Sequence, residues 1–314
     1  MSDSEVLVRA RGLTKRFGDF TAVDGIDFDL YRGEAFGFLG PNGAGKSSTM
    51  RMIGCVSPPS GGEMTILGRD PVRDGSAIRA RLGVVPQEDT LDVELTVREN
   101  LLVYGRYFGL PRRVIRERTD ALLDFVQLSD RAGDKVDPLS GGLKRRLTIA
   151  RSLINEPEIL ILDEPTTGLD PQARHATWDL IGQLRSAGVS IILTTHFMEE
   201  AERLCDYVAI IDHGQLVAAG TPGQLTGTVG QLRFRAEPGL DIDSLLAALP
   251  PASLAKESPA GHYVIEVHGA VDPLLLAAVT AWCAERGVLA TSLRSESRTL
   301  EDVFLELTGK ELRS

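Results

Sequence analysis

The segment Gly40–Ser47 constrains this chain more than any other, because its sequence GPNGAGKS fits the pattern G-x-x-x-x-G-K-[ST]. It follows a short apolar run, Ala35–Leu39, and precedes a stretch of helical character, Ser47–Ile53. In this context of strand, loop and helix, the glycines let consecutive backbone N–H groups form a nest for an anion. The N-terminus of the helix adds the positive end of its dipole. The segment therefore predicts a phosphate-binding loop rather than an ordinary tight turn.

Two side chains of this loop have predicted roles in binding a nucleoside triphosphate. Lys46 can reach the β- and γ-phosphates, and the hydroxyl of Ser47 can ligate Mg²⁺. The residues of the loop expected to contact the nucleotide are Gly40, Asn42, Gly43, Gly45, Lys46, Ser47 and Ser48.

A second apolar run, Ile159–Leu162, ends in two adjacent carboxylates, Asp163 and Glu164. Because ligands of open α/β sheets bind at the carboxyl ends of the strands, both residues are expected to face the nucleotide. Asp163 fits the carboxylate that holds Mg²⁺ in proteins with a phosphate loop. Glu164 can polarise the attacking water as a general base.

Three further elements distinguish this chain from other phosphate-loop proteins. Gln87 follows a short strand, and the segment Leu139–Leu143, with the sequence LSGGL, precedes an arginine-rich helix. His196 ends the apolar run Ile191–Thr195.

With these motifs in this order, the chain resembles the nucleotide-binding domains of ABC ATPases over about Val6–Thr221. Many NTPases share the phosphate loop, whereas the Ser-Gly-Gly segment upstream of Asp163-Glu164 is far more specific. The resemblance implies an α/β fold of the P-loop NTPase class, with a RecA-like core, an antiparallel β subdomain and a helical insertion at about 92–150. It also implies ATP and Mg²⁺ as cofactors.

The resemblance further implies that two copies of the chain pair head to tail around two ATP molecules. Ser140 and Gly142 of one copy would then meet the γ-phosphate held by Lys46 of the other, and Asp170 would lie at the interface. Leu143 departs from the family pattern, which usually has glutamine there, so a side-chain contact from this position to the nucleotide is not expected.

The remaining roles also come from the resemblance. His196 would contact the γ-phosphate, Gln87 would contact Mg²⁺, and Phe17 would stack on adenine, the alternative being an ordinary core phenylalanine. The expected catalytic residues are Lys46, Gln87, Glu164 and His196. The expected metal ligands are Ser47, Gln87 and Asp163.

A second domain is expected after a cluster of Gly, Thr and Pro near Gly220–Gly230. We predict an ATPase domain at 1–225 and a small α+β domain at 226–314, with a regulatory or dimer-stabilising role. The expected strands are Leu232–Arg235, Tyr263–Val267 and Val288–Leu293. The expected helices are Ile242–Leu249, an amphipathic Leu274–Arg286, and Leu300–Leu307 with Gly309 as its C-cap.

Composition narrows the range of partners. The net charge is −10, so counterion release on DNA or RNA would contribute little, and nucleic acid is not expected as a partner. No apolar run is long enough to span a bilayer, and the start of the chain lacks the features of a signal peptide. We therefore expect a cytoplasmic protein that is held at the inner face of the membrane by a separate polytopic permease.

Three segments favour an exporter. Val85–Asp92 and Leu95–Leu101 resemble drug-resistance and nodulation-factor exporters, and Leu300–Gly309 resembles the C-terminal extension of drug-resistance exporter ATPases. The substrate would be an amphipathic drug, lipid or glycoconjugate, with Asp92–Tyr107 as the docking surface for the permease. Two alternatives remain, a soluble ABC ATPase that acts on ribosomes or DNA, and an importer motor. The presence of one ATPase domain disfavours the first alternative.

Overall fold

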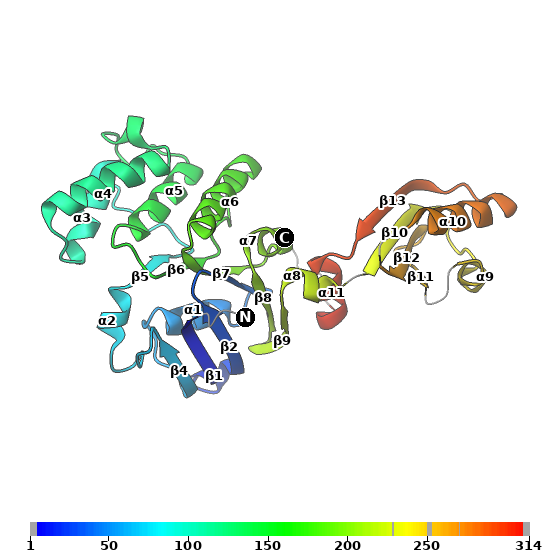
Figure 1. Ribbon diagram of the computed structural model, residues 1–314, viewed down its shortest axis with the longest axis horizontal. Coiled ribbons are helices and arrows are strands. Elements are labelled where there is room, and N and C mark those ends of the chain that lie inside the picture. Colours follow the sequence, from blue (N-terminus) through cyan, green and yellow to red (C-terminus); the bar gives the residue numbers. More distant parts are fainter. Residues whose placement is uncertain (1–4, 228, 250–252, 270, 310–314) are drawn as a thin grey trace. The chain divides into compact units, whose positions relative to one another are not determined.

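The computed structural model describes residues 5–227, 229–249, 253–269 and 271–309. The chain divides into two compact units, the first ending at Pro222 and the second beginning at Gly223 (Figure 1). This division lies close to the predicted one at residue 225.

The first unit is built around a six-stranded sheet with the order β5-β6-β7-β3-β8-β9. The first five of these strands run parallel, and β9 pairs with β8 in the antiparallel sense. In β3, β6 and β7 almost every residue is buried, as expected for parallel strands covered on both faces. The strands are β3 (Ala35–Leu39), β5 (Leu82–Val85), β6 (Ile159–Asp163), β7 (Ser190–Thr195), β8 (Tyr207–Asp212) and β9 (Gln215–Gly220).

A second sheet of the first unit is antiparallel, with the order β2-β1-β4. Its strands are β1 (Val6–Phe17), β2 (Phe20–Tyr31) and β4 (Gly61–Ile66). Register shifts on both sides of Leu13 interrupt the alternation of buried and exposed residues in β1. Alternation alone therefore indicates a shorter strand than the one that forms.

The helices of the first unit fall into two groups. Three helices, α3 (Val97–Tyr107), α4 (Arg112–Phe125) and α5 (Gly141–Ser152), contact one another and form the helical insertion, with a short 3₁₀ turn at Ser129–Arg131. Thr96 and Glu99 form a capping box at the start of α3, and Pro111 precedes α4. The others are α1 (Lys46–Ile53), α2 (Gly75–Arg79), α6 (Pro171–Ser186) and α7 (Met198–Leu204), with α8 (Pro222–Thr226) at the unit boundary.

The second unit contains a four-stranded antiparallel sheet with the order β11-β12-β10-β13. Apolar residues of α9, α10 and one face of this sheet form a core separate from that of the first unit. The elements are β10 (Val229–Arg235), α9 (Ile242–Ala247), β11 (Leu254–Glu257), β12 (His262–His268), α10 (Pro273–Glu285), β13 (Thr291–Ser297) and α11 (Leu300–Thr308). The predicted fold class is confirmed in both units, although β11 was not predicted.

One expectation for the second unit was wrong. The helix expected at Leu274–Arg286 is present as α10, but it is not amphipathic. Its outward face carries Leu274, which is 74% exposed, together with exposed alanines at 277, 281 and 284. The pattern misleads because small and apolar residues occupy both faces of the helix.

Candidate functional site

The loop between β3 and α1 has the backbone that the sequence predicts for a phosphate cradle. Gly43 and Gly45 have φ values of 84° and 105°, in the left-handed region that favours glycine. A Cβ at Gly40 would clash with the carbonyl oxygen of Ile211, and one at Gly45 with that of Ala22. Close packing therefore requires glycine at positions 40 and 45. Conformation alone favours glycine at Gly43, because a Cβ there would meet open space.

Lys46 is folded back across this loop. Its side chain is 4% exposed, and Nζ donates hydrogen bonds to the carbonyl oxygens of Gly40 (2.7 Å) and Pro41 (3.1 Å). Nζ also lies 3.4 Å from Oε1 of Glu164. Burial lowers the pKa of Lys46 below its ordinary value, and the neighbouring carboxylate of Glu164 partly offsets this effect.

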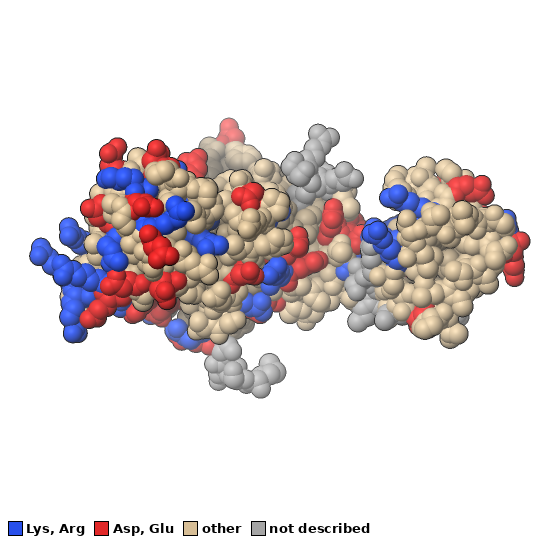
Figure 2. All heavy atoms as spheres, turned by 90° about the horizontal axis from the view of Figure 1, so that it is seen from above, with Lys and Arg blue, Asp and Glu red and all other residues tan. Residues whose placement is uncertain are grey.

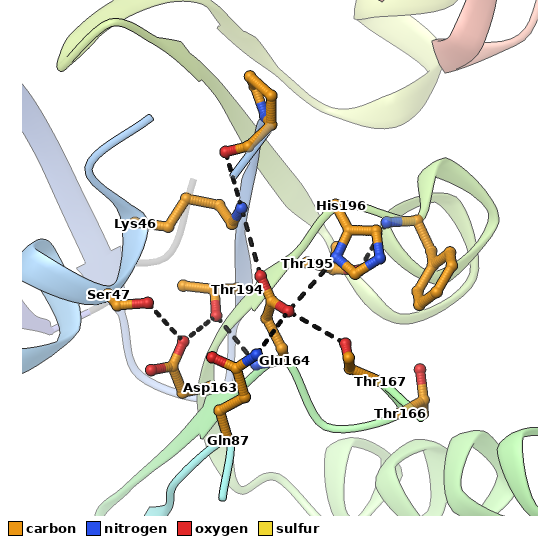
Figure 3. A network of polar contacts seen from close by, with 12 residues as sticks. Lys46, Ser47, Gln87, Asp163, Glu164, Thr166, Thr167, Thr194, Thr195 and His196 are labelled. Atoms are coloured by element: carbon orange, nitrogen blue, oxygen red, sulfur yellow. Dashed lines mark hydrogen bonds and ion pairs between the residues drawn. The ribbon is translucent and has the colours of Figure 1, made fainter. Parts of the chain in front are cut away.

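The two carboxylates at the end of β6 point in different directions and have different partners (Figure 3). Asp163 accepts hydrogen bonds from the hydroxyls of Thr194 (2.5 Å) and Ser47 (3.4 Å). Glu164 has a φ of 45°, and its backbone N–H donates to Thr194 at the end of β7. This left-handed turn aims Glu164 at Lys46 rather than at Asp163 and Ser47.

Glu164 is the centre of a polar network whose members come from four segments of the chain (Figure 3). Its Oε2 accepts hydrogen bonds from Thr167 (3.0 Å) and from the amide of Gln87 (3.3 Å), and lies 3.4 Å from Nδ1 of His196. Its Oε1 faces Lys46. The sequence predicted that Lys46, Gln87, Glu164 and His196 act together, and the structure brings these four side chains into contact.

The surroundings of Glu164 keep its carboxylate ionised. The contact with His196 and the charge of Lys46 hold its pKa down at about 2, against the opposing effect of burial. A carboxylate with this pKa is negatively charged at every physiological pH. It therefore acts as a hydrogen-bond acceptor and as a negative charge.

Arg145 was not predicted as a site residue, although it belongs to the arginine-rich helix that follows Leu139–Leu143. The structure buries its guanidinium, which donates to the carbonyl oxygens of Pro86 (2.5 Å), Asp163 (3.1 Å), Glu164 (3.1 Å) and Pro165 (2.6 Å). Arg145 thus ties helix α5 to the carboxylate turn and to the residue before Gln87. Helical spacing was the available signal, because Arg145 shares a face with buried residues at 148, 149 and 152.

Ser140, Gly142 and Asp170 form a second group on the helix starts of α5 and α6. Ser140 caps α5 by accepting from the N–H of Leu143 (3.5 Å), and Asp170 caps α6 by accepting from the N–H of Ala173 (2.9 Å). A Cβ at Gly142 would lie 2.7 Å from the Cβ of Ala173, so glycine is needed for close packing of the two helices. These contacts remain within α5 and α6 and do not reach the network around Glu164.

The remaining predicted residues lie at the edge of the phosphate loop or beyond it. Phe17, at the end of β1, is 51% exposed, with Nζ of Lys15 lying 5.0 Å from its ring centroid. It is therefore not a core residue. In the loop, Asn42 is exposed and Ser48 is partly buried.

A magnesium site is compatible with the oxygen atoms present. The Ser47 hydroxyl and the Asp163 carboxylate are 3.4 Å apart, and both are hard ligands of the kind that Mg²⁺ prefers. Among the described residues no cluster of three or more His, Cys, Asp or Glu side chains could hold a metal. A site with two protein oxygens is typical of Mg²⁺, which usually takes its other ligands from phosphate and water.

Comparisons with known proteins agree with this geometry. A model of the ABC transporter family matches residues 23–167. A Nod factor export ATP-binding protein I from Ralstonia nicotianae is 44% identical over 311 residues, covering 99% of this chain and 96% of the relative. A protein of the same name from Rhizobium sp. (strain N33) is 44% identical over 318 residues and matches over 98% of this chain and 99% of its own length.

This chain belongs to the ATP-binding cassette family of ABC transporters. Solved structures of cassettes match about two thirds of this chain or more. CbiO1 from Clostridium perfringens, part of the ABC transporter complex cbiONQ, has 29% identity and a TM-score of 0.66, with 70% of this chain and 90% of that one covered. A cassette solved as a dimer in a post-hydrolysis state with ADP and Pi has 27% identity and a TM-score of 0.62, with 68% and 98% covered.

As a member of this family the chain is an ATPase that binds ATP. None of the helices in its described residues has the length and apolar character needed to cross a membrane.

Proposed function

We propose that this chain is the ATP-hydrolysing subunit of an exporter, and that its ATPase cycle drives a separate membrane-spanning subunit. The observation that carries the proposal is the match to relatives named for Nod factor export, which extends over nearly the whole chain, second unit included. The transported molecule would be an amphipathic drug, lipid or glycoconjugate.

In this proposal the phosphate loop binds the triphosphate of ATP. Lys46 contacts the β- and γ-phosphates, and Ser47, Asp163 and Gln87 hold Mg²⁺. The ion, when bound, neutralises negative charge that develops on the phosphates during transfer. The exposed ring of Phe17 stacks on adenine, which suits a side chain that is only half buried in the isolated protein.

The two oxygens of Glu164 have separate tasks. Oε2 is held by Gln87, Thr167 and His196, which fixes the orientation of the carboxylate. Oε1 faces Lys46, and becomes free to orient and polarise the attacking water when Lys46 turns toward the phosphates. In this scheme His196 also contacts the γ-phosphate.

Glu164→Gln tests this assignment. The substitution preserves the shape of the side chain but removes the charge, so we expect ATP turnover to fall by about 100-fold or more while MgATP binding persists. The variant should also remain as a closed dimer in MgATP, as measured by light scattering. Glu199→Gln makes the same change at an exposed position of α7 and should leave turnover unaltered. Normal turnover in Glu164→Gln would defeat the general-base assignment.

A homodimer completes the proposed site. Ser140 and Gly142 of one copy, at the N-terminus of α5, would meet the γ-phosphate bound by Lys46 of the other copy. Asp170 would lie at the interface. For the second unit we propose a regulatory or dimer-stabilising role. Unchanged assembly with the membrane subunit after deletion of residues 228–314 would refute this role.

The proposed docking surface for the membrane subunit is a groove of about 450 Å³ beside α3. It is lined by residues of α3, by residues of the segment 84–95 and by Arg151 of α5, and Tyr107 in this lining is 79% exposed. An exposed aromatic side chain next to a concave surface is typical of a protein interface. Glu99 is a poor probe of this surface because its carboxylate caps α3.

Arg106→Glu combined with Tyr107→Ala therefore tests the docking surface without disturbing the cap. We expect capture of the membrane subunit to weaken while ATP binding persists. Arg116→Glu, at an exposed position of α4, reverses the same charge away from the groove and is the matched control. Unchanged capture by the double variant would refute this placement.

The proposal places the protein in the cytoplasm, at the inner face of the membrane through its permease. The alternatives are a soluble ATPase that acts on ribosomes or DNA, and an importer motor. A nucleic-acid partner would favour a broad basic surface. On the face seen in Figure 2, basic and acidic side chains are instead intermixed over the first unit. An importer would depend on an external binding protein, which a transport assay would reveal.

A further inference from the structure

The sheet of the second unit has one face in the core and a concave region on the other. Along β10, Leu232 and Phe234 belong to the core formed with α9 and α10. Because side chains alternate along a strand, Arg233 and Arg235 lie on the opposite face. A groove of about 370 Å³ occurs there, between β10, β12 and β13.

Strand register concentrates positive charge in this groove. Arg233 on β10 lies directly opposite Arg294 on β13, and Arg235 lies opposite His262 on β12. All four side chains line the groove. The like charges of Arg233 and Arg294, which lie directly opposite each other on antiparallel strands, destabilise this pair. The arrangement therefore has a cost in the isolated protein, whose net charge is −10.

Among the side chains that the structure describes, an acidic partner is found for Arg233, at one end of this cluster. Arg233 pairs with Asp302 of α11 at 2.7 Å. Glu266 is engaged by Lys256 and by the amide of Gln231. Within the described part of the chain, Arg235 and Arg294 have no carboxylate at ion-pair distance.

The backbone beside the groove is irregular in a way that shapes it. The pairing of β10 with β13 shifts register between Arg233 and Arg235, and Ser292 in the shifted segment has a φ of 53°. Such bulges bend a strand and redirect its side chains. Ser258 and Ser292 also line the groove, and serine hydroxyls can donate hydrogen bonds.

We propose that this groove binds a phosphate-bearing anion, with the guanidinium groups of Arg235 and Arg294 as its principal ligands. Planar guanidinium groups bind phosphate oxygens through paired, charge-assisted hydrogen bonds. The volume suits a small ligand or a headgroup rather than a long polymer. The negative charge would offset the repulsion between the arginines. The phosphate belongs either to a free compound or to a phospholipid headgroup.

Two binding measurements on the full chain test the proposal and separate the sources. Calorimetric titration with pyrophosphate reports free phosphate, and co-sedimentation with phosphatidylglycerol vesicles, compared with phosphatidylcholine vesicles, reports a headgroup. The test variant is Arg235→Gln with Arg294→Gln. The control is Lys256→Gln, which removes a positive charge from β11, outside the groove. Basal ATPase activity, expected to be unchanged in both variants, reports that the first unit is folded. Unchanged fluorescence of Trp282, which is buried in the second unit, reports that the second unit is folded.

A free phosphate ligand predicts two pyrophosphate sites in the unaltered chain, the ATPase loop and the groove. The double variant should weaken only the groove site, by about tenfold or more. A headgroup predicts that vesicle binding is lost in the double variant and kept in Lys256→Gln. The proposal is overturned if the double variant binds pyrophosphate and vesicles as the unaltered chain does. It is equally overturned if Lys256→Gln weakens binding as much as the double variant.

Discussion

Arg145 gives the sharpest test of how the ATPase site is assembled. Arg145 is 4% exposed, and its guanidinium donates to four carbonyl oxygens, with no carboxylate among these hydrogen-bond partners. Arg145→Ala would leave those carbonyls without their donor and would release Glu164 and the residue before Gln87 from α5. Burial removes hydration from the guanidinium and thereby lowers the pKa of Arg145.

The expected loss of stability follows from these bonds. A hydrogen bond from a charged donor contributes about 1.5–3 kcal/mol, and burying the cation has an opposing cost of several kcal/mol. In Arg145→Ala, water that enters the space partly satisfies the four carbonyl groups. We therefore expect the substitution to lower the free energy of unfolding by about 3 kcal/mol. Arg146→Ala should change it by about 0.5 kcal/mol or less, because Arg146 makes an exposed contact with Gln127.

Urea unfolding of the first unit measures this difference. The chain has two tryptophans, Trp178 in the first unit and Trp282 in the second, so a Trp282→Phe background reports the first unit alone. ATP turnover of the folded Arg145→Ala protein should fall by about tenfold or more, because Glu164 and Gln87 lose their common anchor. Equal stability of the Arg145 and Arg146 variants, or full turnover in Arg145→Ala, would refute the reasoning.

Three further predictions concern single side chains. Lys46→Ala should weaken ATP binding by about tenfold or more, as measured by titration calorimetry. It should also raise the pKa of Glu164, as measured by carboxylate NMR, and an unchanged pKa would contradict the contact between Lys46 and Glu164 at 3.4 Å. Phe17→Ala should weaken ATP binding by about two- to tenfold with little change in melting temperature, whereas a large loss of stability would indicate a core role. Burial raises the pKa of Glu200, which accepts from Trp178 and Thr166. A raised pKa means that protonated Glu200 is favoured in the folded state. Its contribution to the free energy of unfolding is complete below the ordinary pKa of 4.5 and is lost as pH rises through the pKa of the folded state. The melting temperature of Glu200→Gln should therefore rise relative to that of the unaltered chain as pH rises. A difference in melting temperature that does not change with pH would contradict this expectation.

Much of the site could be predicted because its residues follow directly from local patterns. The phosphate loop is contiguous, and Asp163, Glu164 and His196 each stand at the end of an apolar strand. Parallel pairing of β6 with β7 and of β7 with β3 then brings these strand ends to one edge of the sheet. The prediction that these strands are parallel was therefore sufficient to expect Asp163, Glu164 and His196 to lie close together.

Other features depend on packing that no local pattern encodes. The hydrogen bonds of Arg145 join residues 18 to 59 positions apart, so helical spacing can indicate that Arg145 is buried but not which carbonyl groups it binds. The cationic groove of the second unit depends on the order β12-β10-β13 and on one register shift. The short strand β11 (Leu254–Glu257) has an alternation too brief to distinguish from a loop.

The central claim, that this ATPase serves an exporter, is tested most directly by affinity capture from detergent-solubilised native membranes. Mass spectrometry then identifies the proteins that co-purify. We predict a polytopic membrane protein in near-equal amount, and its loss when Arg106→Glu is combined with Tyr107→Ala. If the chain co-purifies with ribosomal or DNA-bound proteins and is absent from the membrane fraction, the exporter function is contradicted and only the assignment as an ATPase remains.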